Sequence, residues 1–454
     1  MHAVVTPEEM RAIDAGSETD LDVLVARAGW AVARTARQML GGTYGRRVTV
    51  LAGRGHNGAD GLVAARNLQA WGVRTAIVRV DRATPAPDHI ADCDLVIDAA
   101  FGTGFSGTFV APRVGSIPVL AVDIPSGVDG LTGLVPRASQ PFVCARTITF
   151  AALKPGLLFA DGPGYCGALE VADIGLVTPS PVHVIDEVTV RLRLPTRGRS
   201  AHKWSAAVLV IGGSEGMSGA PTLAARAAMR TGAGMVRLGV PGEKHPSAGP
   251  FGAEVVGALL PAAEWEDAAV KASQKCGAVV IGPGLGRSGE ATQGVRAVLA
   301  RTETLPTVVD ADGLAVFPKY RIGNRSAAAG VVLTPHDGEY KTMTGQPAGD
   351  DRIRAARKLA QITNAVVLLK GPVTVVADQH NRVELVLNGD SRLATAGSGD
   401  VLSGIIGALM AQGLPAFEAA STGAFVHGAA ASLGTARGFI AGDIIDHLPD
   451  WLSR

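Results

Sequence analysis

The sequence predicts two α/β domains, each with a parallel sheet that helices cover on both faces to give three αβα layers. Short runs rich in Val, Ile and Leu alternate with longer alanine-rich amphipathic stretches. This alternation restarts after about residue 200, which indicates a second domain. With 454 residues, the chain is long enough for about two or three domains of ordinary size.

The first half begins with a helix signal and continues with a series of strands. Thr6, Pro7 and Glu9 have the pattern of a capping box with proline at the first helical position. A helix is predicted at 59–72 and strands at 48–53, 75–80, 95–102, 119–127 and 145–152. The carboxyl ends of parallel strands meet at one edge of the sheet, and ligands bind at that edge in such folds.

The second half repeats this organisation over a longer stretch. Helices are predicted at 220–232 and 399–413, and strands at 206–213, 234–240, 278–284, 306–313, 331–336, 365–371 and 374–378. Between the halves, residues 177–204 carry three prolines and several basic residues, which is typical of a linker. We therefore expect a domain boundary near residue 184, with domains at 1–184 and 185–454.

Composition excludes several classes of function. Lys plus Arg is 42 and Asp plus Glu is 41, so the net charge of +1 gives no electrostatic signature for nucleic acid or an anionic membrane. No segment has about 18 consecutive apolar residues, and the start has no signal-peptide pattern. The four cysteines have no metal-binding spacing. We expect a cytoplasmic protein, and its high apolar content favours a homo-oligomer.

A glycine-rich turn at 53–61 is the first candidate site. It follows a strand and opens a helix, where backbone N–H groups and the helix dipole favour an anion such as phosphate. Asn57 and Asp60 add side-chain oxygens within this turn, and Asp98, Asp123 and Ser126 lie at two other strand ends. Such oxygens suit a hard or weakly charged cation. The alternative is that these side chains only cap helices.

Four segments in order identify a resemblance over residues 6–178. They are GRGHNGADG, VIDAAFGTGFSG, VDIPSGVDG and TITFAALKPGLLFADGPGYCGALEVADIGL. Together they resemble the YjeF N-terminal family, the NAD(P)HX epimerases, which implies a Rossmann-like domain that interconverts the R and S hydrates of NADH and NADPH. The family usually has Asn-Asn-Gly-Gly-Asp in the first segment, whereas this chain has His56 and Ala59 in place of the first Asn and the second Gly.

The resemblance also implies roles for individual residues. Asn57, Asp98 and Ser126 would bind potassium, and Asp123 would move a proton as general acid and base. The hydrated dinucleotide would be held by His56, Asn57, Gly58, Ala59, Asp60, Gly102, Thr103, Gly104, Phe105, Ser106, Gly107 and Thr108, together with Asp123. Lys154 is a further candidate for assisting the reaction, but the sequence favours a solvated loop lysine.

The strongest feature of the second half is the segment from Ala396 to Gly404. Gly397, Ser398, Gly399 and Asp400 open a long apolar helix, so free N–H groups and the positive end of the dipole face one spot. This arrangement can stabilise a phosphoryl group in transfer, with Asp400 as the base. The alternative is that Asp400 only complements the helix dipole. The GxxxxGK[ST] pattern of P-loop enzymes does not occur.

This segment and several others resemble the YjeF C-terminal family, the NAD(P)HX dehydratases, over residues 188–452. The other segments are HKWSAAVLVIGGSEGMSGAPTLAARAAMRTGAG, GPGLG, VVDADGL, LTPHDGE and LLKGPVT. The resemblance implies a ribokinase-like fold and an ADP-dependent dehydration with Mg²⁺. Departures from the family pattern are Ala396, where Gly is usual, and Trp204, which follows His202-Lys203 where Gly is usual.

By this second resemblance, Ala220, Gly284 or Gly286, His336 and Asp400 would contact the hydrated cofactor. The adenine nucleotide would be held by Lys370, Gly371, Pro372, Val373 and Thr374 with Gly399. Phosphorylation of the C6 hydroxyl followed by loss of phosphate would regenerate NAD(P)H, because phosphate is a better leaving group than hydroxide. His336 is alternatively an ordinary helix-start histidine.

Two other functions remain open from sequence. The chain is alternatively a kinase of a small alcohol or vitamin precursor with an N-terminal ligand-binding domain. A second alternative is that the first half is a ligand-binding or scaffold module without catalytic activity. A kinase accumulates a phosphorylated product, whereas a dehydratase releases phosphate, and replacement of Asp123 distinguishes a scaffold from an epimerase.

Overall fold

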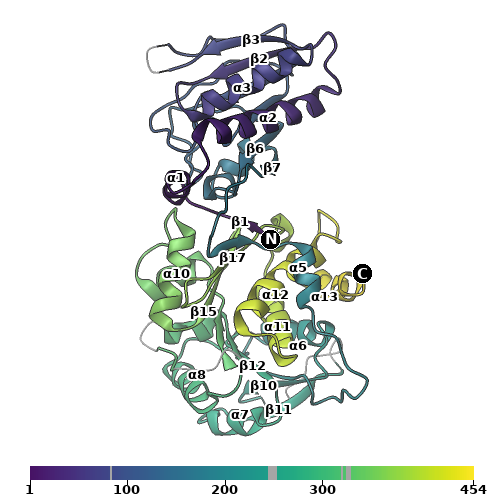
Figure 1. Ribbon diagram of the computed structural model, residues 1–454. Helices are drawn as coiled ribbons and strands as arrows, with labels where there is room; N and C mark the ends of the chain where they lie inside the picture. Colours follow the sequence, from purple (N-terminus) through teal and green to yellow (C-terminus); the bar gives the residue numbers. More distant parts are fainter. Residues whose placement is uncertain (82–83, 244–252, 318–320, 324–328) are drawn as a thin grey trace. The chain divides into compact units, whose positions relative to one another are not determined.

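The computed structural model describes residues 1–81, 84–243, 253–317, 321–323 and 329–454. The chain divides between Val182 and His183 into two units with separate cores (Figure 1). We call residues 2–182 the first unit, and Met1 with residues 183–454 the second unit. The boundary expected from sequence lies at residue 184.

The first unit is built on a parallel sheet with the strand order β3-β2-β4-β5-β6-β7. Its strands are β2 (Arg47–Ala52), β3 (Arg74–Arg79), β4 (Leu95–Ala99), β5 (Val119–Val122), β6 (Arg146–Phe150) and β7 (Ala168–Ala172). Its helices are α1 (Pro7–Ala15), α2 (Leu21–Leu40), α3 (His56–Ala70) and α4 (Gly162–Cys166), and a short strand β1 (His2–Ala3) precedes them. The capping box predicted at Thr6 is present: its hydroxyl accepts from Glu9 N, and Glu9 Oε2 accepts from Thr6 N.

The two faces of this sheet are covered differently. Helices α2 and α3 pack on one face, where their alanines and leucines meet Val48, Val50 and Ile97 of the strands. On the other face, connecting segments supply Ile90, Phe109 and other apolar side chains against the strands. Parallel α/β order is therefore as predicted, with connecting segments forming much of the second covering layer.

The second unit contains a larger mixed sheet with the order β8-β17-β16-β15-β14-β13-β12-β9-β10-β11. Pairing is parallel from β15 to β11 and antiparallel at β15–β16 and β16–β17. These strands are β8 (Val182–Val184), β9 (Ala207–Ile211), β10 (Met235–Pro241), β11 (Val256–Leu260), β12 (Ala278–Ile281), β13 (Thr307–Val309), β14 (Val331–Leu333), β15 (Val366–Leu369), β16 (Thr374–Ala377) and β17 (Val383–Val386).

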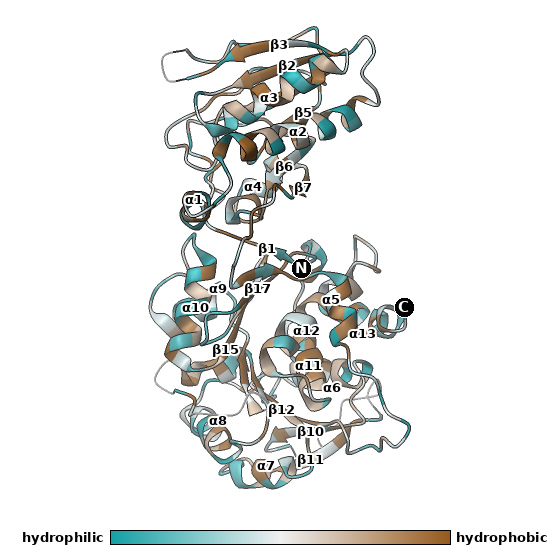
Figure 2. Ribbon diagram, viewed as in Figure 1, coloured by the Kyte–Doolittle hydropathy of each residue, from teal (hydrophilic) through white to brown (hydrophobic). Residues whose placement is uncertain are grey.

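Helices cover both faces of this second sheet (Figure 1). They are α5 (Glu187–Arg193), α6 (Gly219–Arg230), α7 (Glu266–Ser273), α8 (Gly289–Arg301), α9 (Asp337–Thr344), α10 (Arg352–Thr363), α11 (Ser398–Ala411), α12 (Ala416–Ala431) and α13 (Ala441–Leu452). Helix α11 packs against α6, α12 and strands β9, β12 and β13. Its apolar residues, drawn in brown in Figure 2, are buried all round, as expected for a helix enclosed in a core.

The segment 177–204, expected to be a linker, is only partly irregular. It contains β8 and α5, and the expectation is wrong for these residues. Asp186 caps α5 by accepting from Thr189 N at 2.8 Å, and Arg193 pairs with the buried Glu384 at 2.6 Å. The flanking prolines concealed this short helix because they are strong loop signals.

A membrane-spanning helix needs about 20 consecutive apolar residues. Within the described ranges, none of the helices meets this requirement of length and hydropathy.

Candidate active sites

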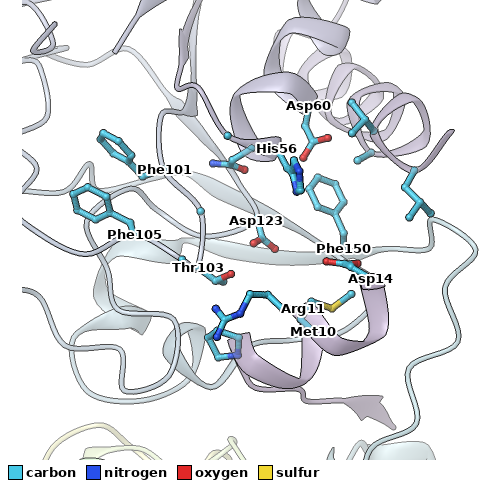
Figure 3. A pocket seen from close by; sticks show the side chains of 18 of the residues that line it. Met10, Arg11, Asp14, His56, Asp60, Phe101, Thr103, Phe105, Asp123 and Phe150 are labelled. Atoms are coloured by element: carbon cyan, nitrogen blue, oxygen red, sulfur yellow. The ribbon is translucent and has the colours of Figure 1, made fainter. Parts of the chain in front are cut away.

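The first candidate site lies at the carboxyl edge of the sheet in the first unit. Strand β2 lies between β3 and β4 in the sheet. The chain passes from β2 to β3 toward one edge of the sheet and from β4 to β5 toward the other edge. Open α/β sheets bind ligands at the carboxyl ends of two strands whose connections diverge in this way. A cavity of about 870 Å³ opens there. Its walls include His56, Asn57, Asp60, Asp123 and Lys154, and Figure 3 shows several of them around one space.

The glycine-rich turn is folded tightly against the next strand end. A Cβ atom on Gly53 would lie 1.9 Å from Ala100 O, and one on Gly58 would lie 2.0 Å from Gly53 O, so neither position admits a side chain. His56 is exposed at the first position of α3, and Ala59 lies in the first turn of that helix. Alanine is the most favoured helical residue, so the replacement at 59 introduces no backbone strain.

Asp98 and Ser126 form a buried polar pair behind the cavity. Asp98 accepts from Ser126 Oγ at 2.6 Å and from Ser126 N at 2.8 Å, and Ser126 Oγ accepts from Phe101 N at 2.8 Å. Burial raises the pKa of Asp98 to about 6, although both bonds from Ser126 lower it. The residues that follow β4 link this pair to Asn57, since a Cβ on Gly102 would lie 3.5 Å from Asn57 Cβ.

The side chain of Asn57 is the clearest sign of a ligand site in this region. Its side chain is buried, and neither Oδ1 nor Nδ2 has a hydrogen-bond partner among the described residues. An unpartnered buried amide is costly unless something binds to it. The oxygens of Asn57, Asp98 and Ser126, with one carboxylate among them, fit a weakly charged cation such as potassium.

Asp123 directly follows β5 and has a left-handed backbone conformation, with φ of 66°. Its Oδ1 atom accepts from Lys154 Nζ at 2.7 Å and from Thr149 Oγ1 at 3.0 Å. The other oxygen, Oδ2, faces the segment after β4, since a Cβ on Gly102 would lie 3.8 Å from it. One carboxylate oxygen is therefore held by the protein, and the other is turned to the cavity side.

The expectation that Lys154 is a solvated loop lysine is wrong. Its side chain is only 2% exposed, and its ammonium donates to Thr149 Oγ1 at 2.8 Å and to Phe150 O at 3.0 Å besides pairing with Asp123. The residues after it, Pro155–Leu157, form a buried 3₁₀ turn that draws the lysine inward. Three partners for one ammonium make its burial tolerable.

Asp60 adds a second carboxyl to the cavity in a different electrostatic environment. It is 7% exposed, and burial raises its pKa to about 8, with further increases from the negative charges of Asp123 and Asp14. Figure 3 shows Asp60, His56 and Asp14 around the same space as Asp123. Asp60 thus keeps its proton at neutral pH, whereas Asp123 lies against an ammonium group.

The segment from Gly102 to Thr108 follows β4 and forms a wall between two cavities. Gly102, Thr103 and Gly104 line the first cavity, and Gly107 and Thr108 line a neighbouring one of about 770 Å³. Phe105 and Ser106 line both. The ring of Phe105 stacks on Phe101 with centroids 4.2 Å apart.

The second candidate site lies at the start of α11 in the second unit. Gly397 has φ of 86°, and a Cβ there would lie 2.4 Å from Leu223, so only glycine fits. Asp400 follows in the first turn and is half-buried. Burial and the charge of Asp310 raise the pKa of Asp400 to about 7, against the lowering effect of Lys370. A carboxyl with this pKa is suited to take a proton near neutral pH.

Asp310 and Lys370 form the centre of this second site. Asp310 accepts from Ser403 Oγ at 2.5 Å, from Thr334 Oγ1 at 2.6 Å and from Lys370 Nζ at 3.1 Å. Burial alone would raise the pKa of Asp310, but Lys370 and the two hydroxyls lower it below its usual value. Lys370 also lies 3.7 Å from Glu339 Oε2. Burial lowers the pKa of Lys370, but the negative charges of Asp310, Glu339 and Asp400 raise it by more, so the pKa is raised overall.

Gly284 and Ala220, two of the residues predicted to contact the hydrated cofactor, lie next to each other. A Cβ on Gly284 would lie 3.3 Å from Ala220 Cβ and 2.7 Å from Met217 O, and Gly284 has φ of 64°. Gly286 N donates to Asp312 Oδ2 at 3.0 Å, and Asp312 comes two residues after Asp310 in the chain. The loop after β12 and the start of α6 therefore adjoin the end of β13.

His336 caps helix α9. Its Nδ1 accepts from Gly338 N at 3.0 Å and from Glu339 N at 3.2 Å, while Glu339 Oε2 accepts from His336 N. This is the helix-start alternative considered from sequence. The side chain is still 58% exposed, so its outer edge is open to a ligand.

The turn from Gly371 to Thr374 joins β15 to β16 beside Lys370. Arg352 donates to Lys370 O at 2.7 Å, and a Cβ on Gly371 would lie 2.7 Å from the same Arg352 nitrogen. Pro372 and Val373 complete the turn, and Thr374 begins β16.

The hydroxyl of Ser398, at the start of α11, contacts a buried histidine. Ser398 Oγ lies 3.2 Å from Nε2 of His427, and burial lowers the pKa of His427 to about 4. His427 is therefore neutral and fixes the Ser398 hydroxyl.

Sequence reasoning missed Asp310 and Thr149 as site residues. Asp310 lies in VVDADGL, inside the strand predicted at 306–313, and directly follows the observed β13, which is a position where ligand-binding residues gather. Thr149 lies inside β6 and carried no comparable signal.

Comparisons with known proteins match both units. The family described as NAD(P)H-hydrate dehydratase matches residues 208–452, and the YjeF-related protein N-terminus family matches residues 21–88 and 74–156. The bifunctional NAD(P)H-hydrate repair enzyme of Mycobacterium leprae is 38% identical over 451 residues, covering 91% of this chain and 90% of the relative. Its counterpart in Moorella thermoacetica is 35% identical and covers 98% and 96%.

A solved structure resembles the second unit. It is the ADP/ATP-dependent NAD(P)H-hydrate dehydratase from Bacillus subtilis co-crystallised with ATP and Mg²⁺. That chain is 31% identical, with a TM-score of 0.54, and the match covers 60% of this chain and 98% of that one. The fold is also that of a ribokinase-like superfamily protein from Enterococcus faecalis, which is 20% identical with a TM-score of 0.54 over 61% of this chain and 97% of that one. The ribokinase-like fold expected for the second half is confirmed by these likenesses.

Proposed function

Because the chain belongs to the family of bifunctional NAD(P)H-hydrate repair enzymes, we propose that its two units act in turn on the same damaged cofactors. Residues 1–184 interconvert the R and S forms of hydrated NADH and NADPH. Residues 185–454 dehydrate the S form with ADP as phosphoryl donor. The observation that carries this proposal is the Asp400 carboxyl, with a pKa of about 7, at the amide-rich start of α11.

The epimerase reaction inverts C6 of the hydrated nicotinamide ring. If the ring opens, the C6 hydroxyl loses its proton as the C6–N1 bond breaks, and the nitrogen gains one. If the C6–O bond breaks instead, the departing oxygen takes up a proton. Either route moves a proton at the C6 oxygen, and Asp123 Oδ2 is a carboxylate oxygen turned toward the cavity that can take part in this step.

The remaining residues of the first site hold the substrate. The free N–H groups at the start of α3, those of His56, Asn57 and Gly58, favour the pyrophosphate of the dinucleotide, since Ala59 N already donates to Gly55 O. The segment from Gly102 to Thr108 forms the facing wall. Potassium, held by Asn57, Asp98 and Ser126, would supply positive charge beside this anionic substrate. The unpartnered Asn57 amide supports that assignment.

In the second unit, Asp400 takes the proton from the C6 hydroxyl. The C6 oxygen then attacks the terminal phosphorus of ADP, and the bond to the departing AMP breaks. The phosphate group leaves C6, a proton leaves C5, and the double bond of NAD(P)H is restored. Lys370 and the N–H groups of Gly397 and Gly399 are suited to bind the phosphoryl oxygens, whereas Ser398 N donates to Thr395 O. Mg²⁺ would neutralise further charge on the nucleotide.

A kinase of a small alcohol shares this second-site chemistry, but both family matches favour repair over that alternative. The test is incubation of the purified protein with mixed-epimer hydrated NADPH, Mg²⁺ and either ADP or ATP. We expect recovery of reduced-nicotinamide absorbance with release of one phosphate per NADPH, and AMP as the product from ADP. Accumulation of a stable phosphorylated hydrate without NADPH would refute the proposal.

A further inference from the structure

Lys154 is chemically distinctive within the first unit. It is the one lysine among residues 1–182 of the sequence. Its ammonium has three N–H bonds, and three acceptors surround it: Asp123 Oδ1, Thr149 Oγ1 and Phe150 O. With a side chain 2% exposed, the charge is almost fully withdrawn from water.

A buried ion pair of this kind is poor evidence for a purely stabilising role. The loss of hydration of both charges offsets much of their attraction, and apolar residues of similar size fill a core at lower cost. Lys154 and Asp123 nevertheless lie at the wall of the cavity described above. The pair is therefore better explained by what it does to the Asp123 carboxylate.

The hydrogen bonds divide the two oxygens of Asp123 into different roles. Thr149 Oγ1 accepts from Lys154 and donates to Asp123 Oδ1, so the three side chains form a closed triangle on that one oxygen. Oδ2 has no part in the triangle and faces the Gly102 side of the cavity. The carboxylate plane is thereby fixed with one oxygen available to a ligand.

Two other carboxyl groups lie near Asp123. Asp60 reaches the cavity from α3 and Asp14 from α1, and both interact electrostatically with Asp123. His56 lies at the start of α3 on the same cavity. Among these groups, Lys154 is the cation in direct contact with Asp123.

We propose that Lys154 and Thr149 are positioning residues of the epimerase site: they fix Asp123 Oδ1 through an ion pair and a hydrogen bond, so that Oδ2 accepts and returns the proton at the C6 oxygen. This inference rests on the epimerase function proposed above. It assigns to both residues an action through Asp123 and no contact with the substrate.

A double-mutant cycle tests this relation. The variants are Lys154→Met, Asp123→Asn and the two combined, and the assay follows the interconversion of purified R- and S-hydrated NADPH. We expect each single variant to lose about 10²-fold or more in kcat, with KM changed little. The combined variant should be no slower than Asp123→Asn, because Lys154 then has no carboxylate to act on. Additive losses would overturn the proposal.

Thr149→Val gives a second test that does not remove a buried charge. The valine keeps the shape of the side chain but removes the hydroxyl bound to Asp123, and kcat should fall about 10-fold or more. Thr147→Val is the matched control, because Thr147 is also buried on β6 but donates to Cys166 O, away from the site. Equal rates in these two variants would contradict the role of Thr149.

The dehydratase unit provides an internal activity standard in all these variants. Dehydration of purified S-hydrate with ADP should stay at the wild-type rate, which shows that the second unit is intact, and an unchanged KM for epimerisation shows that the first unit still folds and binds its substrate. If the wild-type protein does not interconvert the hydrates, the proposed epimerase function fails. If it does, and Lys154→Met keeps the wild-type kcat, only the positioning role fails.

Discussion

Lys370 Nζ lies 3.1 Å from Asp310 Oδ1, and a Cβ atom on Gly399 would lie 3.3 Å from the same nitrogen. The ammonium thus lies between a buried carboxylate and the first turn of α11. Its positive charge and the N–H groups of that turn act on the same region, where the proposed phosphoryl transfer takes place.

Removal of this ammonium should therefore weaken the second reaction strongly. For Lys370→Met we expect kcat for ADP-dependent dehydration to fall about 10²-fold or more, because charge that develops on the phosphoryl oxygens loses its partner. Steady-state rates with S-hydrated NADPH and ADP measure this. Lys341→Met, at an exposed position of α9, is the control and should keep the wild-type rate. Equal behaviour of the two variants would argue against phosphoryl transfer at α11.

The dehydration rate should depend on pH through Asp400. The pKa of Asp400 is raised to about 7, so below this pH the carboxyl is protonated and cannot take the hydroxyl proton. We expect kcat/KM for S-hydrated NADPH to rise with pH through about 7 and then level off. Asp400→Asn should lose about 10²-fold or more. A flat pH profile between 6 and 8 would contradict the role of Asp400 as base.

Asp60 should make the stability of the first unit depend on pH in the opposite sense to an ordinary salt-bridged acid. Its pKa rises from 3.8 to about 8 in the folded protein, so the folded state binds more protons than the unfolded state between these values. Stability contributed by the neutral carboxyl is therefore lost as pH rises toward 8, by at most about 1.4 kcal/mol per pH unit.

Asp60→Asn removes this titration. In thermal unfolding from pH 5.5 to 8.5 without potassium, the melting temperature of the wild type should decline relative to that of the variant as pH rises. If the melting temperatures of the wild type and the variant changed in parallel with pH across this range, Asp60 would be ionised in the folded protein.

Sequence patterns predicted the alternation of strands and helices well, and local reasons explain this. The apolar runs and glycine punctuation that mark β2 or α11 are properties of neighbouring residues. The fold class and the family resemblance are confirmed by the comparisons. The short helix α5 was missed because nearby prolines outweighed the capping signal of Asp186.

Contacts across the sheet were beyond sequence reasoning. Lys154 meets Asp123 because β5 and β6 are adjacent, and the two residues are 31 positions apart. Asp310 and Lys370 are 60 positions apart and meet because they follow β13 and β15, which lie on either side of β14. Local periodicity contains no information about such pairs, so the burial of Lys154 and the importance of Asp310 appear only in the folded structure.

Potassium should act on the first unit through Asn57. In wild-type protein we expect faster epimerisation in potassium chloride than in choline chloride at equal ionic strength, because the buried amide oxygen of Asn57 gains a partner. Asn57→Ala should lose this response, while dehydration of S-hydrate by the same preparation continues. A variant that keeps the full potassium response would exclude Asn57 as a ligand.

The most direct measurement of the whole account follows NADPH recovery from an equal mixture of the two hydrates with ADP and Mg²⁺. The wild type should convert both hydrates, Asp123→Asn should convert the S half rapidly and then stall, and Asp400→Asn should interconvert the hydrates while producing almost no NADPH. Full recovery by Asp123→Asn at the wild-type rate, or rapid NADPH formation by Asp400→Asn, would contradict the assignment of two successive reactions to these two carboxylates.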